Sequence, residues 1–166
     1  MPAGNTYEAI ATQTLGSSVA TVTFSSIPST YTDLVLVFAG TQTGAGVTYI
    51  AIQYNGDTGA NYSYTALAGN GSAASSGRSS NNNEFYVTLG NPVTTTQNNM
   101  IMQVMNYSNT TTNKTTLVRS NNASERTEAT VGLYRSTSAI NSILVKIGAN
   151  NFATGSVFSL YGIKAA

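Results

Sequence analysis

The chain contains no cysteine, no histidine and no tryptophan. Without cysteine it can form no disulfide framework and no thiolate metal site. Without histidine it lacks the commonest general base and any Ser-His-Asp or Cys-His arrangement. The carboxylates are spread along the sequence, and only Glu125 and Glu128 lie close together. We therefore expect a non-enzymatic protein with no cofactor and no metal site.

A hydrolase stays open as an alternative. A glycosidase needs two carboxyl groups on either side of one bond, and folding could bring Asp57 or Glu84 beside another carboxylate. Nothing in the sequence indicates that it does.

Charge of either sign is also scarce. Charged residues make up 8% of the 166 residues, and the formal net charge is +1, whereas a typical soluble domain is about 25% charged. The basic residues are scattered and offset by carboxylates, so no patch could displace many counterions from a nucleic acid. A neutral polar surface costs less to desolvate than a charged one, which favours contact with other proteins. We expect protein partners and no nucleic acid.

Long apolar runs are missing as well. No run approaches the roughly 18 residues that a membrane span requires. The opening stretch MPAGNTYEAI has neither a basic region nor an apolar region of the kind found in secretory signals. These features predict a protein made in a cytoplasm, without a membrane partner.

The sequence is rich in Val, Ile, Thr, Tyr and Phe runs separated by turn-forming residues. Such spacing is typical of an all-β sandwich or barrel. We predict one domain, residues 1–166, folded as an antiparallel, jelly-roll-like β-sandwich of about eight to ten strands. Only residues 137–143 hint at a helical turn. The expected strands are Tyr7–Leu15, Val19–Phe24, Leu34–Thr43, Thr48–Tyr54, Glu84–Leu89, Met100–Tyr107, Thr115–Ser120, Ala129–Arg135, Ile140–Ile147 and Ser156–Ile163.

Several local patterns make this prediction sharper. The run LVLVF at 34–38 does not alternate, so that strand is expected to be buried on both faces, and the run NNMIMQVMNY at 98–107 is expected to behave similarly. Asn55-Gly56 suits the positive φ of a tight turn. The methionines at 100, 102 and 105 are expected to fill gaps in the core.

Residues 68–83, AGNGSAASSGRSSNNN, are small and polar and offer almost nothing to bury. We predict a long polar loop, or an arm that is ordered only by a neighbouring molecule. The alternative is a solvated hairpin tip.

The stretch SVFSLYGIKAA, from Ser156, reads as a strand with two apolar faces. With a period of two, Phe158 and Leu160 point one way, and Val157, Tyr161 and Ile163 point the other. We expect the first pair in the core. The second set is expected to face a covering loop or a neighbouring subunit.

Tyrosine is the dominant aromatic residue, with ten copies. Tyrosines beside turns suit protein interfaces and sugar stacking equally well. The interface that we predict from the sequence consists of Tyr161, Ile163, Arg78, Tyr62 and Tyr64.

Three motifs together carry a resemblance. The stretches TFSSIPSTYTDLVLVF at 23–38, YNGDTGANYSY at 54–64 and SVFSLYGIKAA at 156–166 resemble the signature of a family of virion proteins from tailed bacteriophages, including phages of cyanobacteria. The resemblance implies a jelly-roll-like structural protein of the particle with no catalytic residues. Members are similar to capsid decoration (cement) proteins and to domains of tail fibres.

The expectation is therefore a decoration protein on the outer surface of the capsid. Its partners would be the major capsid protein and further copies of itself, and the resemblance favours a trimer. The alternative is a tail-fibre or receptor-binding module that recognises host glycans, and only that alternative implies a glycan ligand.

Overall fold

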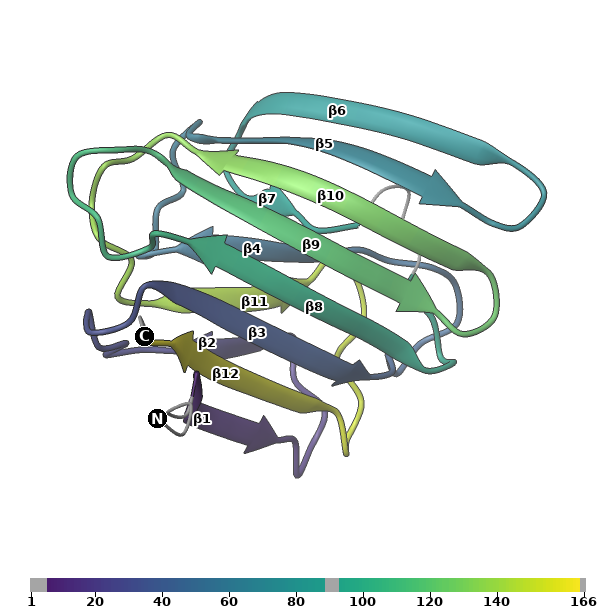
Figure 1. The fold of residues 1–166 in the computed structure, drawn as a ribbon. Coiled ribbons are helices and arrows are strands. Elements are labelled where there is room, and N and C mark those ends of the chain that lie inside the picture. The colour runs from purple at the N-terminus through teal and green to yellow at the C-terminus, as the bar shows by residue number, and fades with distance from the viewer. Residues whose placement is uncertain (1–5, 89–92, 165–166) are drawn as a thin grey trace.

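The computed structural model describes residues 6–88 and 93–164, and its strands form two packed antiparallel sheets (Figure 1). Within those ranges the chain contains twelve strands and no helix, which confirms the all-β sandwich. The strands are β1 (Tyr7–Thr14), β2 (Thr21–Phe24), β3 (Asp33–Gly40), β4 (Ile50–Tyr54), β5 (Tyr62–Gly69), β6 (Ala74–Asn82), β7 (Phe85–Tyr86), β8 (Asn98–Met105), β9 (Lys114–Asn122), β10 (Arg126–Tyr134), β11 (Ile143–Ile147) and β12 (Val157–Ile163).

The larger sheet has eight strands in the order β1-β12-β3-β8-β9-β10-β5-β6, and the smaller has four in the order β2-β11-β4-β7. Figure 1 shows the smaller sheet covering one face of the larger one, with β6 and β1 at opposite edges. The larger sheet therefore has an inner face, in the core, and an outer face.

Alternation of buried and exposed residues decides which side chains reach the core. In β8, for example, Met100, Met102 and Val104 are buried, while Ile101 between them is exposed. The expectation that this strand is buried on both faces is therefore wrong, because its second face lies on the outside of the sheet. The predicted core position of Met100 and Met102 is confirmed, whereas Met105 is only half-buried. At one place in the core, the rings of Phe38 and Phe158 are stacked with centroids 4.7 Å apart.

Strand β12 lies inside the larger sheet, paired with β1 on one side and β3 on the other. Phe158 and Leu160 are fully buried, as predicted. Tyr161 and Ile163 are half-buried on the outer face. Residues 165–166 of the C-terminal stretch lie outside the described ranges.

Strand β3 is nearly buried on both faces. Leu34, Leu36 and Phe38 enter the core, and Val35 on the outer face is 8% exposed. Only Val37 departs from the expectation, because it is half-buried.

The expected tight turn is present. Asn55 and Gly56 have φ values of 55° and 67°, and Asp57 N donates a hydrogen bond of 2.9 Å to Tyr54 O. Two positive φ values define a type I′ turn, for which Asn-Gly is the preferred pair.

The predicted long loop at 68–83 is wrong. Most of this segment is β6, a nine-residue strand that pairs with β5, and the only loop in it is a tight turn at residues 70–73. Asn70 N donates to Ala73 O, and Gly71 has a φ of 86°. Small polar residues have low strand propensity, but backbone pairing to a neighbour holds them in a strand at a sheet edge.

Two further expectations fail. Residues 137–143 form no helical turn. The strand predicted over Glu84–Leu89 is limited to β7, with Leu89 outside the described ranges. The strands missed from the sequence, β5 and β6, account for the excess over ten.

A buried lysine joins two loops at one end of the sandwich. Lys114 is fully buried. Its Nζ donates to Thr112 O at 2.7 Å and to Thr137 O at 3.2 Å. Burial lowers the pKa of this ammonium group.

Candidate functional site: the outer face of the larger sheet

The outer face of the larger sheet is formed by the side chains that alternate with the buried ones along each strand and point away from the core. Strand pairing places Tyr161 beside Val35, and Leu117 beside Val131. In the next row, it places Val37 beside Ile101. Apolar residues thus recur along two adjacent rows that cross most of the sheet, and these rows are interrupted by Gln103 and by Arg119. We call this set the outer stripe; it consists of Tyr7, Tyr161, Val35, Val37, Ile101, Leu117, Val131 and Leu67.

Five members of the outer stripe are strongly exposed. Their exposed fractions are Leu67 63%, Tyr7 59%, Val131 50%, Ile101 41% and Leu117 38%. Single exposed apolar residues are ordinary, but a contiguous group on one face marks an interaction surface.

A hollow of about 350 Å³ lies at the β1 side of the outer stripe. It is lined by Tyr7, Val35, Val37, Ile101, Arg119 and Tyr161. Two aromatic rings, an arginine and an aliphatic floor therefore meet in one depression. Tyrosine and arginine are the residue types most enriched among the energetically dominant residues of protein interfaces.

A second and larger hollow, of about 710 Å³, lies toward the β6 side. Its lining includes Ser63, Thr65, Arg78, Thr115, Val131 and Leu133. Hydroxyl side chains are more numerous in this lining, which also includes Tyr64. The two hollows show that the outer face is uneven rather than flat.

Charge on the outer face is sparse. Arg119 and Arg78 are exposed there. Asp33, at the end of β3, accepts hydrogen bonds from Gln103 Nε2 at 3.0 Å and from Asn106 N at 2.8 Å. Because the face carries few charges, the desolvation free energy that opposes its burial by a partner is small.

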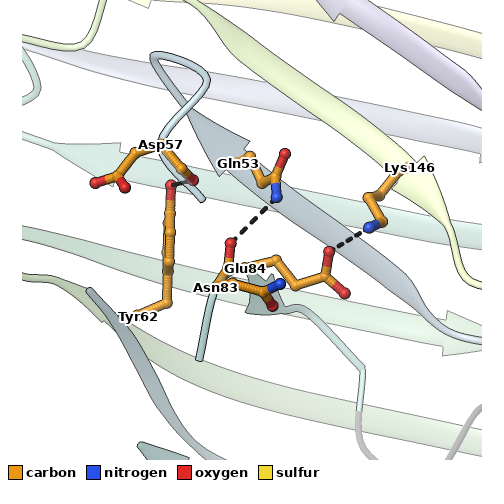
Figure 2. Close-up of polar contacts among 6 residues, drawn as sticks. All are labelled: Gln53, Asp57, Tyr62, Asn83, Glu84 and Lys146. Atoms are coloured by element: carbon orange, nitrogen blue, oxygen red, sulfur yellow. Dashed lines mark hydrogen bonds and ion pairs between the residues drawn. The ribbon is translucent and has the colours of Figure 1, made fainter. Parts of the chain in front are cut away.

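Asp57 and Glu84, the two carboxylates considered for a hydrolase, contact different groups. Figure 2 shows the Glu84 carboxylate directed toward Lys146 and the Asp57 carboxylate directed away from Glu84. Glu84 Oε2 is 2.5 Å from Lys146 Nζ, and the Glu84 side chain is buried. Folding therefore does not bring Asp57 and Glu84 together as a pair.

Tyr86, which lies near Glu84, is held in its neutral form. Tyr86 packs edge-on against Tyr49 with ring centroids 4.9 Å apart. Burial raises the pKa of Tyr86, and the negative charge of Glu84 raises it further. A raised pKa makes a phenol a poorer base at neutral pH. Gln53 Nε2 donates to Asn83 O at 3.1 Å in the same region (Figure 2), so these contacts fasten the β6–β7 connection to β4.

Asp57 has a structural environment. Burial acts to raise its pKa, but hydrogen bonds from Gly59 N, Asn61 Nδ2 and the Tyr134 hydroxyl outweigh burial and hold the pKa below its usual value. The backbone oxygen of Asp57 also accepts from the Tyr62 hydroxyl at 3.1 Å (Figure 2). The residue ties the Asn55-Gly56 turn to β5 and β10.

The structure separates the residues predicted as an interface. Tyr161 and Ile163 lie on the outer face of β12, as expected, whereas Arg78 was expected in a loop or arm and lies on the outer face of β6. Tyr64 is half-buried on the opposite face and packs against Tyr86, with ring centroids 5.9 Å apart. Tyr62 was predicted at the surface, and this is wrong: it is fully buried. Its ring stacks on Tyr134 at 4.8 Å, because even-numbered residues of β5 face the core.

Most of the outer stripe was missed from the sequence. Ile101, Leu117 and Val131 stand at positions whose neighbours on both sides enter the core. The signal that could have identified them is an apolar residue at a strand position where the alternation predicts a side chain facing solvent.

No group of three or more metal-ligating side chains lies within residues 6–88 and 93–164. The same ranges contain no helix long and apolar enough to cross a membrane.

Comparisons with known proteins add little. No protein-family model matches the chain, and no curated protein matches it significantly. Among solved structures, it is similar to an alginate lyase mutant in complex with an alginate tetrasaccharide. That likeness has 10% identity and a TM-score of 0.28, and it covers 93% of this chain and 80% of the other. A likeness this weak gives no argument for or against catalysis.

Proposed function

We propose that the chain is a structural protein of a bacteriophage particle, a capsid decoration protein that binds the major capsid protein through the outer face of its larger sheet. The observation that carries the binding role is the outer stripe. The three resembling sequence motifs supply the viral context.

The composition of the outer face supports a protein partner. Leu117 and Val131 are direct cross-strand neighbours, Ile101 pairs with Val37, and the surrounding positions are mostly Ser, Thr, Ala and Asn. Protein interfaces have apolar centres, polar rims and few charged residues at the centre. A partner that covers the outer stripe removes apolar area from water at little electrostatic cost.

One observation favours the fibre alternative. The hollow that holds Tyr7, Tyr161 and Arg119 combines flat aromatic rings with a guanidinium group. Such a combination suits an acidic sugar, which stacks on tyrosine and pairs with arginine. Under this alternative the ligand is a host glycan.

The outer face can be tested with a matched pair of valines. Val131 lies in the outer stripe, and Val47 is 54% exposed in the loop between β3 and β4. Val131→Glu should raise the dissociation constant for virions stripped of this chain by about 100-fold, because an unpaired carboxylate would have to be desolvated. Val47→Glu makes the same chemical change away from the face and should leave binding unchanged.

The result is interpretable only if both variants keep the thermal midpoint of the wild type. Equal binding by the two variants contradicts a docking role for the outer stripe. Copy number per particle separates the two functions. A number comparable with that of the major capsid protein supports decoration, and a few copies support a fibre.

A further inference from the structure

The four edges of the two sheets are not equally protected. In the smaller sheet, the edge strands β2 and β7 have four and two residues. In the larger sheet, β1 has a bulge between Ala9 and Ala11, and its Glu8 forms an ion pair with Lys164. Shortness, bulges and charges are the means by which proteins prevent edge-to-edge association.

Strand β6 has few of these protections. It is nine residues long and contains no proline, lysine, aspartate or glutamate. Its bulge lies near its end, at the register shift opposite Tyr62–Tyr64, so residues 74–79 form a regular edge. Nothing in the described part of the chain pairs with its far side.

The pairing with β5 determines which backbone groups point outward. The turn hydrogen bond from Asn70 N to Ala73 O makes that pair a bonded one. Bonded and non-bonded pairs alternate in an antiparallel ladder. The N–H and C=O groups of Ala74, Ser76 and Arg78 therefore point away from β5, and only another extended strand can satisfy them in regular order.

We propose that β6 is a self-association edge: two copies of the chain pair β6 against β6, antiparallel, about a two-fold axis. A second copy is the partner that brings the same unprotected strand, so one contact satisfies both edges. Apart from Arg78, the side chains of β6 are neutral and small, so two copies of the strand can pair without steric conflict. This inference adds an assembly partner to the proposed function and does not depend on it.

The single charge on β6 selects the register. Arg78 opposite Arg78 would place like charges across the ladder, which is unfavourable. With Ser76 opposite Ser76, each Arg78 faces Ala74 of the second copy. The two arginines are then four residues apart along the strand, roughly 14 Å at about 3.4 Å per residue, beyond the Debye length in physiological salt.

This register also joins the two outer faces. Ser76 pairs with Leu67 inside each copy, so the two exposed leucines flank the axis on the same face. The dimer presents two outer stripes as one continuous surface. Because a two-fold contact closes at two copies, it favours a dimer over the trimer that the family resemblance implies.

The test is sedimentation velocity of the isolated full-length chain over a range of concentrations, without capsids. The wild type should reach a dimer. Ser76→Pro should raise the dimer dissociation constant about 30-fold or more, because two symmetry-related hydrogen bonds are lost while the Ser76 N–H makes no bond to β5. Ser76→Ala keeps the N–H and should dimerise like the wild type.

Two more variants keep the test decisive if the proline disturbs folding. Ser76→Lys places two ammonium groups opposite each other and should weaken the dimer. Ala74→Glu places a carboxylate opposite Arg78 of the second copy and should tighten it about 5-fold. A wild type that stays monomeric, a three-copy assembly, or a dimer indifferent to these changes overturns the inference. Because no capsid is present, any of these results leaves the proposed capsid binding to its own test.

Discussion

The Tyr134 hydroxyl donates a hydrogen bond of 2.9 Å to Asp57 Oδ2, joining the last residue of β10 to the turn after β4. The same carboxylate accepts from Asn61 Nδ2 at 2.8 Å and from Gly59 N at 2.7 Å. One side chain thus closes the turn and anchors it to the larger sheet.

This arrangement predicts a pH dependence of stability. The pKa of Asp57 is lower in the folded chain than in the unfolded chain. Its contribution is therefore present above the unfolded pKa, about 3.9, and is lost as the pH falls through the folded value. Asp57→Asn should lower the free energy of unfolding at neutral pH by about 1 kcal/mol, allowing for solvent screening. Urea unfolding at several pH values measures both effects.

The gap between wild type and Asp57→Asn should narrow as the pH falls below 4 or so, since the wild-type carboxylate is then protonated. A gap that stays constant from neutral to acidic pH would show that the charge of Asp57 contributes nothing.

Substitution of Leu160 tests whether this face of β12 lies in the core. Leu160 is fully buried, so Leu160→Ala should cost about 2 to 5 kcal/mol of folding free energy through lost burial and a residual cavity. Ser159→Ala, on the half-buried outer face of the same strand, is the matched control and should cost much less. Denaturant midpoints measure both, and equal losses would contradict the assigned faces.

Lys114 predicts the effect of removing a buried charge. Lys114→Met removes the donor of the Thr112 and Thr137 carbonyl groups, and each of these part-buried hydrogen bonds contributes about 1 kcal/mol. Part of this loss is offset because the ammonium no longer has to be desolvated. We expect a clear fall in thermal midpoint. Lys164→Met removes an exposed partner of Glu8 and should change the thermal midpoint little. A larger fall in midpoint for Lys164→Met than for Lys114→Met would contradict the structural role given to Lys114.

Composition and turn spacing in the sequence predicted most of the strands. Alternation predicted the faces of β12, where Phe158 and Leu160 are buried as expected. β8 also alternates, although its run was expected to be buried on both faces. β6 could not be found in this way, because its side chains are small and polar and its stability comes from backbone pairing with β5.

The candidate site was harder to predict than the fold. Tyr161 was correctly placed on the outer face, and Arg78 was assigned to a loop, but nothing in one sequence gives the order of strands across a sheet. Leu117 and Val131 become neighbours only through the register of β9 and β10. Tyr62 was misplaced because its nearness to a turn was given more weight than the parity it shares with Ala66 and Ala68, both buried.

The central place of β12 has a consequence for how the chain folds. Phe38 pairs with Phe158, so β3 remains without one of its two neighbours until nearly all of the described chain has been synthesised. Contacts this distant in sequence close slowly, and domains dominated by them fold in milliseconds to seconds. During that delay the apolar run at 34–38 is an open strand, with β8 as the only neighbour it can gain earlier. Nascent chains are therefore most vulnerable to aggregation at β3, and a chaperone that recognises short extended apolar segments would act there first.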